Sequence, residues 1–271
     1  MILAYWRNIF GYFFIGIFSF VIFSCCGCES NTSPNNLTEA YQYIEKKEWS
    51  AAERYLELYL REEERLDLRF EAWNKLLEVG GYLTYNDNWL ISCLEEMYSE
   101  FEDQPEQMKS ILWRLALAYD RIRNYNKSIE YWEKLFIQPG LSVEQQANIL
   151  RKLASSSVKI HRFDIANNYL KNCLELPLSS INRLECLLDR ADIASSMGLF
   201  DEGASYALLV LESDEASIEL KGKAGFILAD IKEQQGNIQK AIELFKSIRE
   251  YYPNAMVVDQ RLQLLQAKNK H

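Results

Sequence analysis

The residues with the greatest capacity for chemistry in this 271-residue chain are six cysteines and two histidines. Cys25, Cys26 and Cys28 are close enough to share a metal ion, but no second Cys/His pair follows to complete a zinc site. His161 and His271 have no partnered cysteine or serine that would form a nucleophile and base pair. G-x-S-x-G, P-loop and HExxH motifs do not occur. We therefore predict no metal site, no cofactor and no enzymatic activity.

The remaining cysteines, Cys93, Cys173 and Cys186, lie on apolar faces of predicted helices. Free cysteines in such positions are commonly buried and unreactive, and this is the expected state of all three. Cys173 and Cys186 belong to consecutive predicted helices. A disulfide between them is therefore the alternative if the chain enters an oxidising compartment.

Residues 1–24 differ in composition from the rest of the chain. Arg7 is their only charged side chain, and a 15-residue apolar segment from Ile9 to Phe23 is followed by Ser24. This arrangement is typical of a secretory signal peptide or a hydrophobic anchor. The polar residues 25–36 that follow are predicted to form a tether.

The sequence Ile22-Phe23-Ser24-Cys25 resembles the lipobox of bacterial lipoproteins. The resemblance implies cleavage before Cys25, attachment of acyl chains such as palmitate to that cysteine (alternatively Cys28), and anchoring to a bacterial membrane. The outer membrane or the periplasmic face is the expected location. In one alternative the segment stays as an uncleaved transmembrane helix, although 16 residues from Ile9 to Ser24 are fewer than the ~20 that span a bilayer. In another it is a cleaved secretory signal without lipid.

A helix–turn–helix pattern from Gly222 to Pro253 indicates how the rest of the chain is built. Apolar residues recur at helical spacing on both sides of Gly236-Asn237, and Pro253 ends the pattern. Similar segments occur at 37–60, 111–139, 148–177 and 184–212, and a degenerate copy is expected within 65–105. Small residues are expected where the two helices of each copy cross, and they are Ala52, Ser128, Ala166, Gly203 and Ala241. The intervals between them are 76, 38, 37 and 38 positions, and 76 is twice 38. Such a fixed period predicts a stacked repeat architecture.

These segments resemble the tetratricopeptide repeat (TPR), through the pattern Leu228-Ala229…Gly236…Ala241…Phe245…Pro253. The resemblance implies an all-α fold, a right-handed α-solenoid of about five to six helical hairpins over residues 37–253. The pitch exceeds the ~34 residues of the family by about one helical turn. Residues 254–271 carry an apolar stripe and are predicted to form a capping helix.

In a TPR-like solenoid the first helix of each hairpin lines the concave face, which implies a groove for a protein partner. Trp113 and Phe226 are expected to anchor an extended segment or a helix of that partner. Leu117 and Ser155 stand where a carboxylate-gripping member of the family would have asparagine, so that mode is not expected. By the resemblance, the groove residues are Trp113, Leu117, Arg121, Arg151, Ser155, Lys159, Leu188, Asp192, Phe226, Asp230 and Glu233.

The net charge of −9, from 39 acidic and 30 basic side chains, argues against a broad basic surface for nucleic acid. The leading hypothesis is a membrane-anchored, non-enzymatic scaffold that binds other proteins of the cell envelope. One alternative is a lipoprotein that binds a peptide or a glycan through groove aromatics such as Trp113. Another is an inner-membrane sensor arm that keeps its amino-terminal helix.

Overall fold

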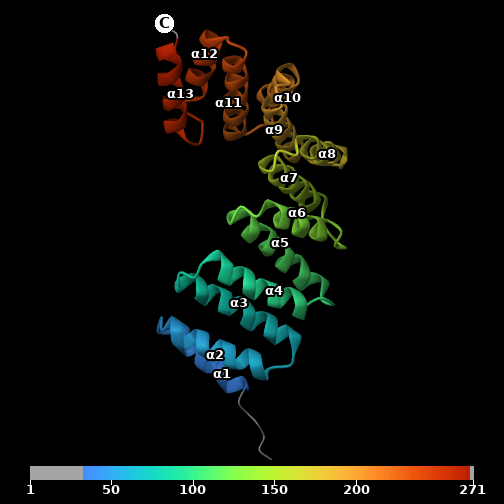
Figure 1. The fold of residues 1–271 in the computed structure, drawn as a ribbon, viewed down its shortest axis with the longest axis vertical. Coiled ribbons are helices and arrows are strands. Elements are labelled where there is room, and N and C mark those ends of the chain that lie inside the picture. The colour runs from blue at the N-terminus through green and yellow to red at the C-terminus, as the bar shows by residue number, and fades with distance from the viewer. Residues whose placement is uncertain (1–32, 269–271) are drawn as a thin grey trace, which may run out of the picture.

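The computed structural model describes residues 33–268, which form thirteen α-helices and no β-strand (Figure 1). The predicted signal segment 1–24 and both candidates for lipid attachment, Cys25 and Cys28, lie outside the described residues. The helices are α1 (Ser33–Glu45), α2 (Trp49–Glu62), α3 (Leu66–Tyr82), α4 (Asp87–Glu100), α5 (Pro105–Arg121), α6 (Tyr125–Phe136), α7 (Val143–Lys159), α8 (Phe163–Glu175), α9 (Ser180–Ser196), α10 (Phe200–Glu212), α11 (Ile218–Gln234), α12 (Ile238–Ile248) and α13 (Ala255–Lys268).

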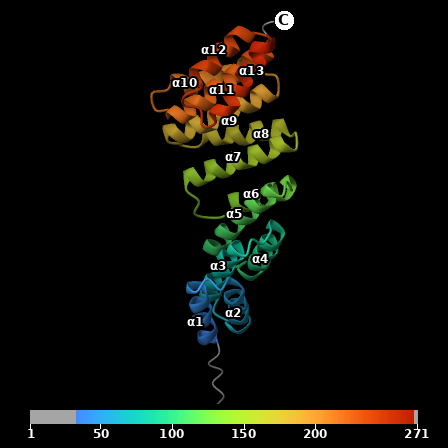
Figure 2. The ribbon, with the colours of Figure 1, turned by 90° about the vertical axis from the view of Figure 1, so that its left-hand side faces the viewer.

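Within this range, the first twelve helices form six hairpins that stack in chain order, with α13 added at the carboxyl-terminal end. Figures 1 and 2 show an elongated molecule in which α1 and α13 lie at opposite ends. Each hairpin contacts mainly its neighbours in the stack, and α9 also contacts both α7 and α11. From α7 to α11 the first helices of successive hairpins contact one another more than the second helices do, so the first helices line the inner side of the curve there. The predicted all-α solenoid is confirmed.

The two helices of every hairpin are joined by the same kind of turn, in which one residue has a positive φ. These residues are Lys47, Thr84, Arg123, His161, Gly198 and Gly236. They are separated by 37, 39, 38, 37 and 38 positions. The next amide donates to a carbonyl five residues earlier, as Asn124 does to Tyr119 and Asn237 to Lys232. This Schellman motif satisfies the last carbonyl groups of the first helix. These turns recur every 37 to 39 residues, also on both sides of the second hairpin, so the degenerate copy has the same repeat length as the others.

Small side chains let the two helices of a hairpin approach closely. The predicted crossing residues are all buried in the structure, and they are Ala52, Ser128, Ala166, Gly203 and Ala241. In the second hairpin the corresponding position holds Leu90, and α3 and α4 contact each other much less than the helices of the other hairpins. The ring of Trp89 lies instead against Gly80 of α3, where an added Cβ atom would be 2.2 Å from it. The degenerate copy is therefore a hairpin with a more open crossing.

Helix boundaries differ from the expected ones at three places. α1 begins at Ser33, so residues 33–36 of the predicted tether form its first turn. Pro105 begins α5 rather than ending the preceding copy, because a proline at the start of a helix costs no intrahelical hydrogen bond. α12 ends at Ile248, before Pro253. α13 occupies the predicted capping segment, and its buried side chains are Val258, Leu262 and Leu265.

Candidate functional site

A cavity of about 440 Å³ opens on the inner face of the stack, between α7 and α9. Arg151, Ser155 and Lys159 face it from α7, because residues four positions apart lie on one side of a helix. The opposite wall comes from α9. We name this cavity the α7–α9 groove, and its lining residues are Asn148, Arg151, Lys152, Ala154, Ser155, Val158, Lys159, Asp189, Asp192 and Ile193.

Serine caps determine where both walls of the groove begin. The Ser142 hydroxyl accepts a hydrogen bond from the amide of Gln145, and the Gln145 side chain accepts one from the amide of Ser142. Ser179 caps α9 in a similar way by accepting from the amide of Asn182. These caps satisfy amides that would otherwise lack partners at the helix starts, and they set the register of the groove residues.

Arg151 joins the two walls of the groove. Its guanidinium forms ion pairs with Glu185 and Asp189 on successive turns of α9. Burial acts to lower the pKa of Arg151, but the hydrogen bond and the charge of Asp189 outweigh it and raise that pKa. Arg151 therefore stays charged and serves as part of the wall.

Lys159 closes the groove toward the preceding hairpin. Its Nζ atom lies 2.9 Å from a carboxylate oxygen of Asp120 in α5, and 5.0 Å from the centroid of the Tyr125 ring. Ser156 donates a hydrogen bond to the same carboxylate at 3.3 Å. Asp120 thus fixes α7 on α5 and neutralises the lysine.

Asp192 is the groove carboxylate that these contacts leave unpaired. Its side chain is exposed, and no residue from 33 to 268 makes a hydrogen bond or ion pair with it. Reduced hydration within the concave surface raises the pKa of Asp192, and the negative charges of Asp189 and Asp230 raise it further. A cationic group in the groove would therefore be attracted to Asp192 without displacing a cation of the described chain.

The structure brings four of the predicted groove residues together, namely Arg151, Ser155, Lys159 and Asp192. The other six lining residues, all from α7 and α9, were not among the predicted groove residues. Helical periodicity could have indicated them, because Asn148 lies three residues before Arg151 and Asp189 three before Asp192. The partner-binding role of this set stays a prediction.

The predicted groove residues of α5 lie away from this cavity. Trp113 packs edge-on against Trp132, with 4.8 Å between ring centroids, and Leu117 also packs against the core. Arg121 pairs with Asp87 of α4 at 2.6 Å. Trp113 is half-buried and also lines a separate cavity of about 190 Å³ with Leu135 and Ile149, so its role as an anchor stays a prediction.

Two predicted apolar residues further along the stack are also engaged in packing. Leu188 is 7% exposed and lies in a cluster with Val210 and Leu220, so it is not available to a partner. Phe226 stacks on Tyr252 with 4.8 Å between ring centroids. The expectation for Leu188 is therefore corrected, whereas Phe226 is half-buried and its role as an anchor stays a prediction.

The predicted acidic residues of α11 are paired with the capping helix. Asp230 and Glu233 form ion pairs with Arg261 of α13. Lys268 of the same helix lies 3.0 Å from Glu233. Helix α13 therefore neutralises the acidic residues that were predicted to contact a partner on this part of the inner face.

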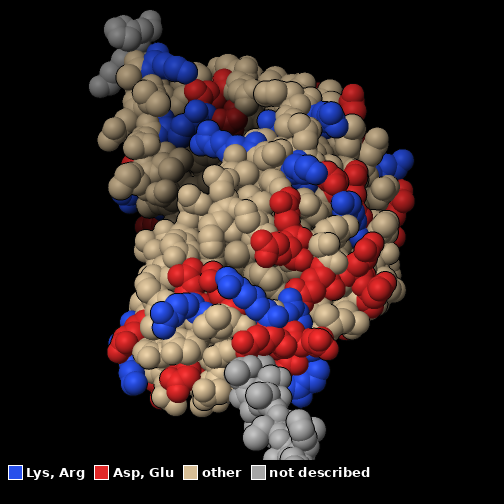
Figure 3. Space-filling view, turned by 60° about the horizontal axis from the view of Figure 1, so that its bottom comes forward, with Lys and Arg blue, Asp and Glu red and all other residues tan. Residues whose placement is uncertain are grey.

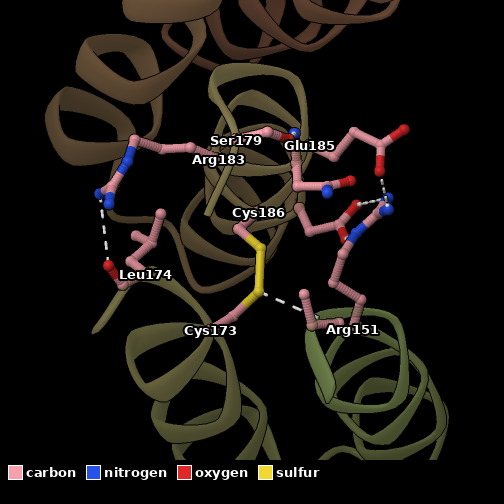
Figure 4. Close-up of a disulfide and its surroundings, with 10 residues drawn as sticks. Arg151, Cys173, Leu174, Ser179, Arg183, Glu185 and Cys186 are labelled. Carbon is pink, nitrogen blue, oxygen red and sulfur yellow. Dashed lines mark hydrogen bonds and ion pairs between the residues drawn. A yellow bond between two sulfur atoms is a disulfide. The ribbon is translucent and has the colours of Figure 1, made fainter. Parts of the chain in front are cut away.

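Cys173 of α8 and Cys186 of α9 form a disulfide beside the groove (Figure 4). Both cysteines are fully buried, and the bond joins the fourth hairpin to the fifth. The default expectation of free thiols is thus wrong for this pair, and the alternative is correct. Cys93 is free and buried, and burial raises the pKa of its thiol to about 11, so it remains protonated.

Residues 33–268 contain no cluster of three or more His, Cys, Asp or Glu side chains suited to a metal. His161 lies in the turn between α7 and α8, where its ring approaches that of Phe163 at 6.0 Å.

Residues 223–255, which include most of α11 and all of α12, match the family model described as a tetratricopeptide repeat. This segment is thus similar to a tetratricopeptide repeat. It coincides with the helix–turn–helix pattern from which the other copies were recognised. No match to a curated protein was found.

Solved structures share the fold over most of the chain. A Rap protein complexed with competence and sporulation factor has a TM-score of 0.58 and 16% identity, over 88% of this chain and 72% of that one. The apo form of RapI has a TM-score of 0.59 and 13% identity, over 86% and 80%. PilW, a widely conserved type IV pilus biogenesis factor, has a TM-score of 0.55 and 19% identity, over 87% and 99%. At these identities the likeness establishes a TPR-like helical solenoid.

Proposed function

We propose that this protein is a non-enzymatic scaffold that holds a segment of a protein partner in the α7–α9 groove. The observation that carries the proposal is the exposed, unpaired carboxylate of Asp192 in a concave cavity of about 440 Å³. A volume of this size lies within the range of about 300–1,000 Å³ that binding sites occupy. Support comes from the Rap protein of the same fold, which was solved in complex with competence and sporulation factor.

The lining of the groove favours an extended segment that carries a basic side chain. Its apolar contacts are offered by Ala154, Val158 and Ile193. Asn148 and Ser155 add exposed hydrogen-bonding groups. A lysine or arginine of the partner would pair with Asp192 and offset its repulsion from the neighbouring carboxylates.

We further propose that the scaffold is lipid-anchored in a bacterial cell envelope through Cys25, with Cys28 as the alternative. Two observations support this, the signal-like segment 1–24 and the Cys173–Cys186 disulfide, because disulfides persist in oxidising compartments. Between residues 33 and 268, no helix has both the length and the apolar character to cross a bilayer. Mass spectrometry of the mature protein tests the anchor: an acylated amino-terminal cysteine is expected, and an unprocessed Met1 would contradict it.

The alternatives differ in what supports them. A glycan-binding role depended on groove aromatics, above all Trp113, and that indole contacts Trp132 and lies outside the α7–α9 groove. The sensor-arm alternative requires that the amino-terminal segment is retained as a membrane helix. The mass of the mature amino terminus therefore separates the sensor arm from the lipid-anchored scaffold.

Photo-crosslinking in cells tests partner binding in the groove. A photoreactive phenylalanine derivative replaces Ser155, which lines the groove, and in the matched control it replaces Ile165, which is exposed on α8. We expect a discrete protein adduct from position 155 that is absent or much weaker from position 165. Equal adducts from both positions, or none from position 155, would contradict the proposal.

A further inference from the structure

We propose that the Cys173–Cys186 disulfide positions the α9 wall of the α7–α9 groove, so that the groove takes its binding form only in the oxidised chain. This inference rests on the proposed function, because it concerns the same groove. It differs from a general stabilising role because the bond lies next to the two carboxylates that hold Arg151.

The disulfide lies where the chain passes from the fourth hairpin to the fifth. Cys173 is in the last turn of α8, and its Sγ atom is 3.8 Å from the carbonyl oxygen of Ala147 in α7. Cys186 is in the second turn of α9, and the two Cα atoms are 6.4 Å apart. As Figure 4 shows, the bond therefore ties the start of α9 to a point where α8 lies against α7.

The residues around Cys186 form the α9 wall of the groove. Glu185 precedes it and pairs with Arg151 of α7 (Figure 4), and Asp189, three positions after Cys186, pairs with the same arginine. A shift or rotation at the start of α9 would move both carboxylates together, because they share one helix with Cys186. Asp192 lies one turn beyond Asp189 and would move with them. The disulfide thus acts on the groove through α9.

The disulfide acts together with the ion pairs of Arg151 and with a buried apolar cluster that joins α9 to α7 and α8 and consists of Ala154, Ala166, Leu170 and Ile193. Arg183 donates one exposed hydrogen bond to the carbonyl oxygen of Leu174, at 3.3 Å. The unpaired Asp192 is repelled by the charges of Asp189 and Asp230 on the inner face. A covalent bond holds α9 against this repulsion, and unlike an exposed ion pair it does not weaken as salt concentration rises.

Reduction removes the constraint in a defined chemical step. A dithiol such as dithiothreitol supplies two electrons and two protons, the sulfur–sulfur bond breaks, and Cys173 and Cys186 become thiols while the dithiol becomes a cyclic disulfide. Both sulfur atoms are buried, so the reagent reacts when this junction opens locally. Replacing both cysteines with alanine removes the same constraint without a reagent.

Hydrogen–deuterium exchange of the purified full chain tests the inference without a partner. In the double variant Cys173→Ala/Cys186→Ala, amides 183–192 are expected to exchange about tenfold faster or more, while amides 108–119 of α5 keep the wild-type rate. Cys93→Ala is the matched control, because it removes a buried cysteine that forms no disulfide. Reduction of the wild type should raise exchange at 183–192, and reoxidation should restore it.

Two exchange results would overturn the inference. Unchanged exchange at 183–192 in the double variant would show that the bond does not position α9. A uniform increase along the whole chain would show that the bond is a general stabiliser. In cells, the adduct from position 155 is expected to fall several-fold in the double variant and to persist in Cys93→Ala. A wild type that forms no adduct would count against the proposed function and leave the exchange result unaffected.

Discussion

Glu63 fixes the junction between the first two hairpins through several hydrogen bonds to one carboxylate. The carboxylate accepts bonds from the Tyr59 hydroxyl and from the backbone and guanidinium of Arg65, at 2.9 to 3.0 Å. The carbonyl oxygen of Glu63 accepts another from Arg69 of α3. The bonds from Arg65 are the main reason that the pKa of Glu63 is lowered to about 2. The ionised form of Glu63 therefore stabilises the folded state.

Glu63→Gln is expected to lower the free energy of unfolding at pH 7 by about 2 kcal/mol, because charge-assisted hydrogen bonds are lost. A lowered pKa means that the ionised group stabilises the folded state above its unfolded pKa, near 4.5, and that this contribution fades as pH falls toward 2. Urea denaturation between pH 7 and pH 2 should therefore show the two proteins converging below about pH 5. Exposed Glu64→Gln is the control and should resemble the wild type throughout. A difference that does not change with pH would contradict this assignment.

From the residue types, the geometry within one hairpin could be predicted better than the contacts between hairpins. The small residues Ala52 and Ala241 were predicted at helix crossings, because their position depends only on spacing within one hairpin. Leu188 was placed in the groove, yet it is buried, because its direction depends on how α9 is rotated against α11. The pairing of Arg151 with Glu185, 34 positions away, likewise depends on how hairpins stack.

At the scale of elements, the second hairpin shows how one substituted position changes a helix crossing. Leu90 occupies the place of a small residue, and α3 and α4 contact each other less than other paired helices. Trp89 fills the space by lying on Gly80, a buried glycine in α3. The adjacent Gly81 is exposed, and an added Cβ would meet nothing within 4 Å. These neighbours thus face opposite environments on the same helix.

Alanine substitutions at these two glycines should have opposite effects on stability. Gly80→Ala is expected to destabilise the protein by about 1–3 kcal/mol, because the new methyl group would overlap the indole of Trp89. Gly81→Ala is expected to stabilise it by about 0.5–1 kcal/mol, because alanine favours the helix and restricts the unfolded chain. Thermal and urea unfolding measure both. Equal effects of the two substitutions would show that the indole does not lie on Gly80.

The turns between paired helices were only partly predictable. Gly198 and Gly236 mark two of them, because glycine adopts a positive φ without steric cost. Lys47, Thr84 and Arg123 adopt the same conformation with a side chain, so their residue types gave no signal. The helical period located these hairpins where the turn residues did not.

At the scale of the whole molecule, the repeat period was the most informative feature of the sequence. It predicted the stacked hairpins over most of the described chain, because each hairpin packs mainly on its neighbours. Contacts that depend on the curvature of the complete stack were not predictable in this way. The engagement of Asp230 and Glu233 by α13 is one such contact.

The charge of the whole molecule also bears on the partner. The net charge is −9, and the view in Figure 3 shows basic side chains dispersed among acidic ones at the amino-terminal end. An acidic protein attracts basic partners over distances longer than a hydrogen bond, and local pairs then fix their position. Asp192 is the groove residue suited to such a pair among those described.

Reversal of one charge in the groove tests the central claim, that a basic protein segment binds between α7 and α9. The measurement is the yield of the adduct from position 155 in cells. Asp192→Lys is expected to lower this yield by roughly tenfold or more, because it replaces the attraction for a cation with repulsion. Asp214→Lys makes the same change in net charge at an exposed carboxylate of the α10–α11 loop, and it is expected to preserve the yield. An unchanged yield with Asp192→Lys, or an equal loss with both variants, would contradict the claim.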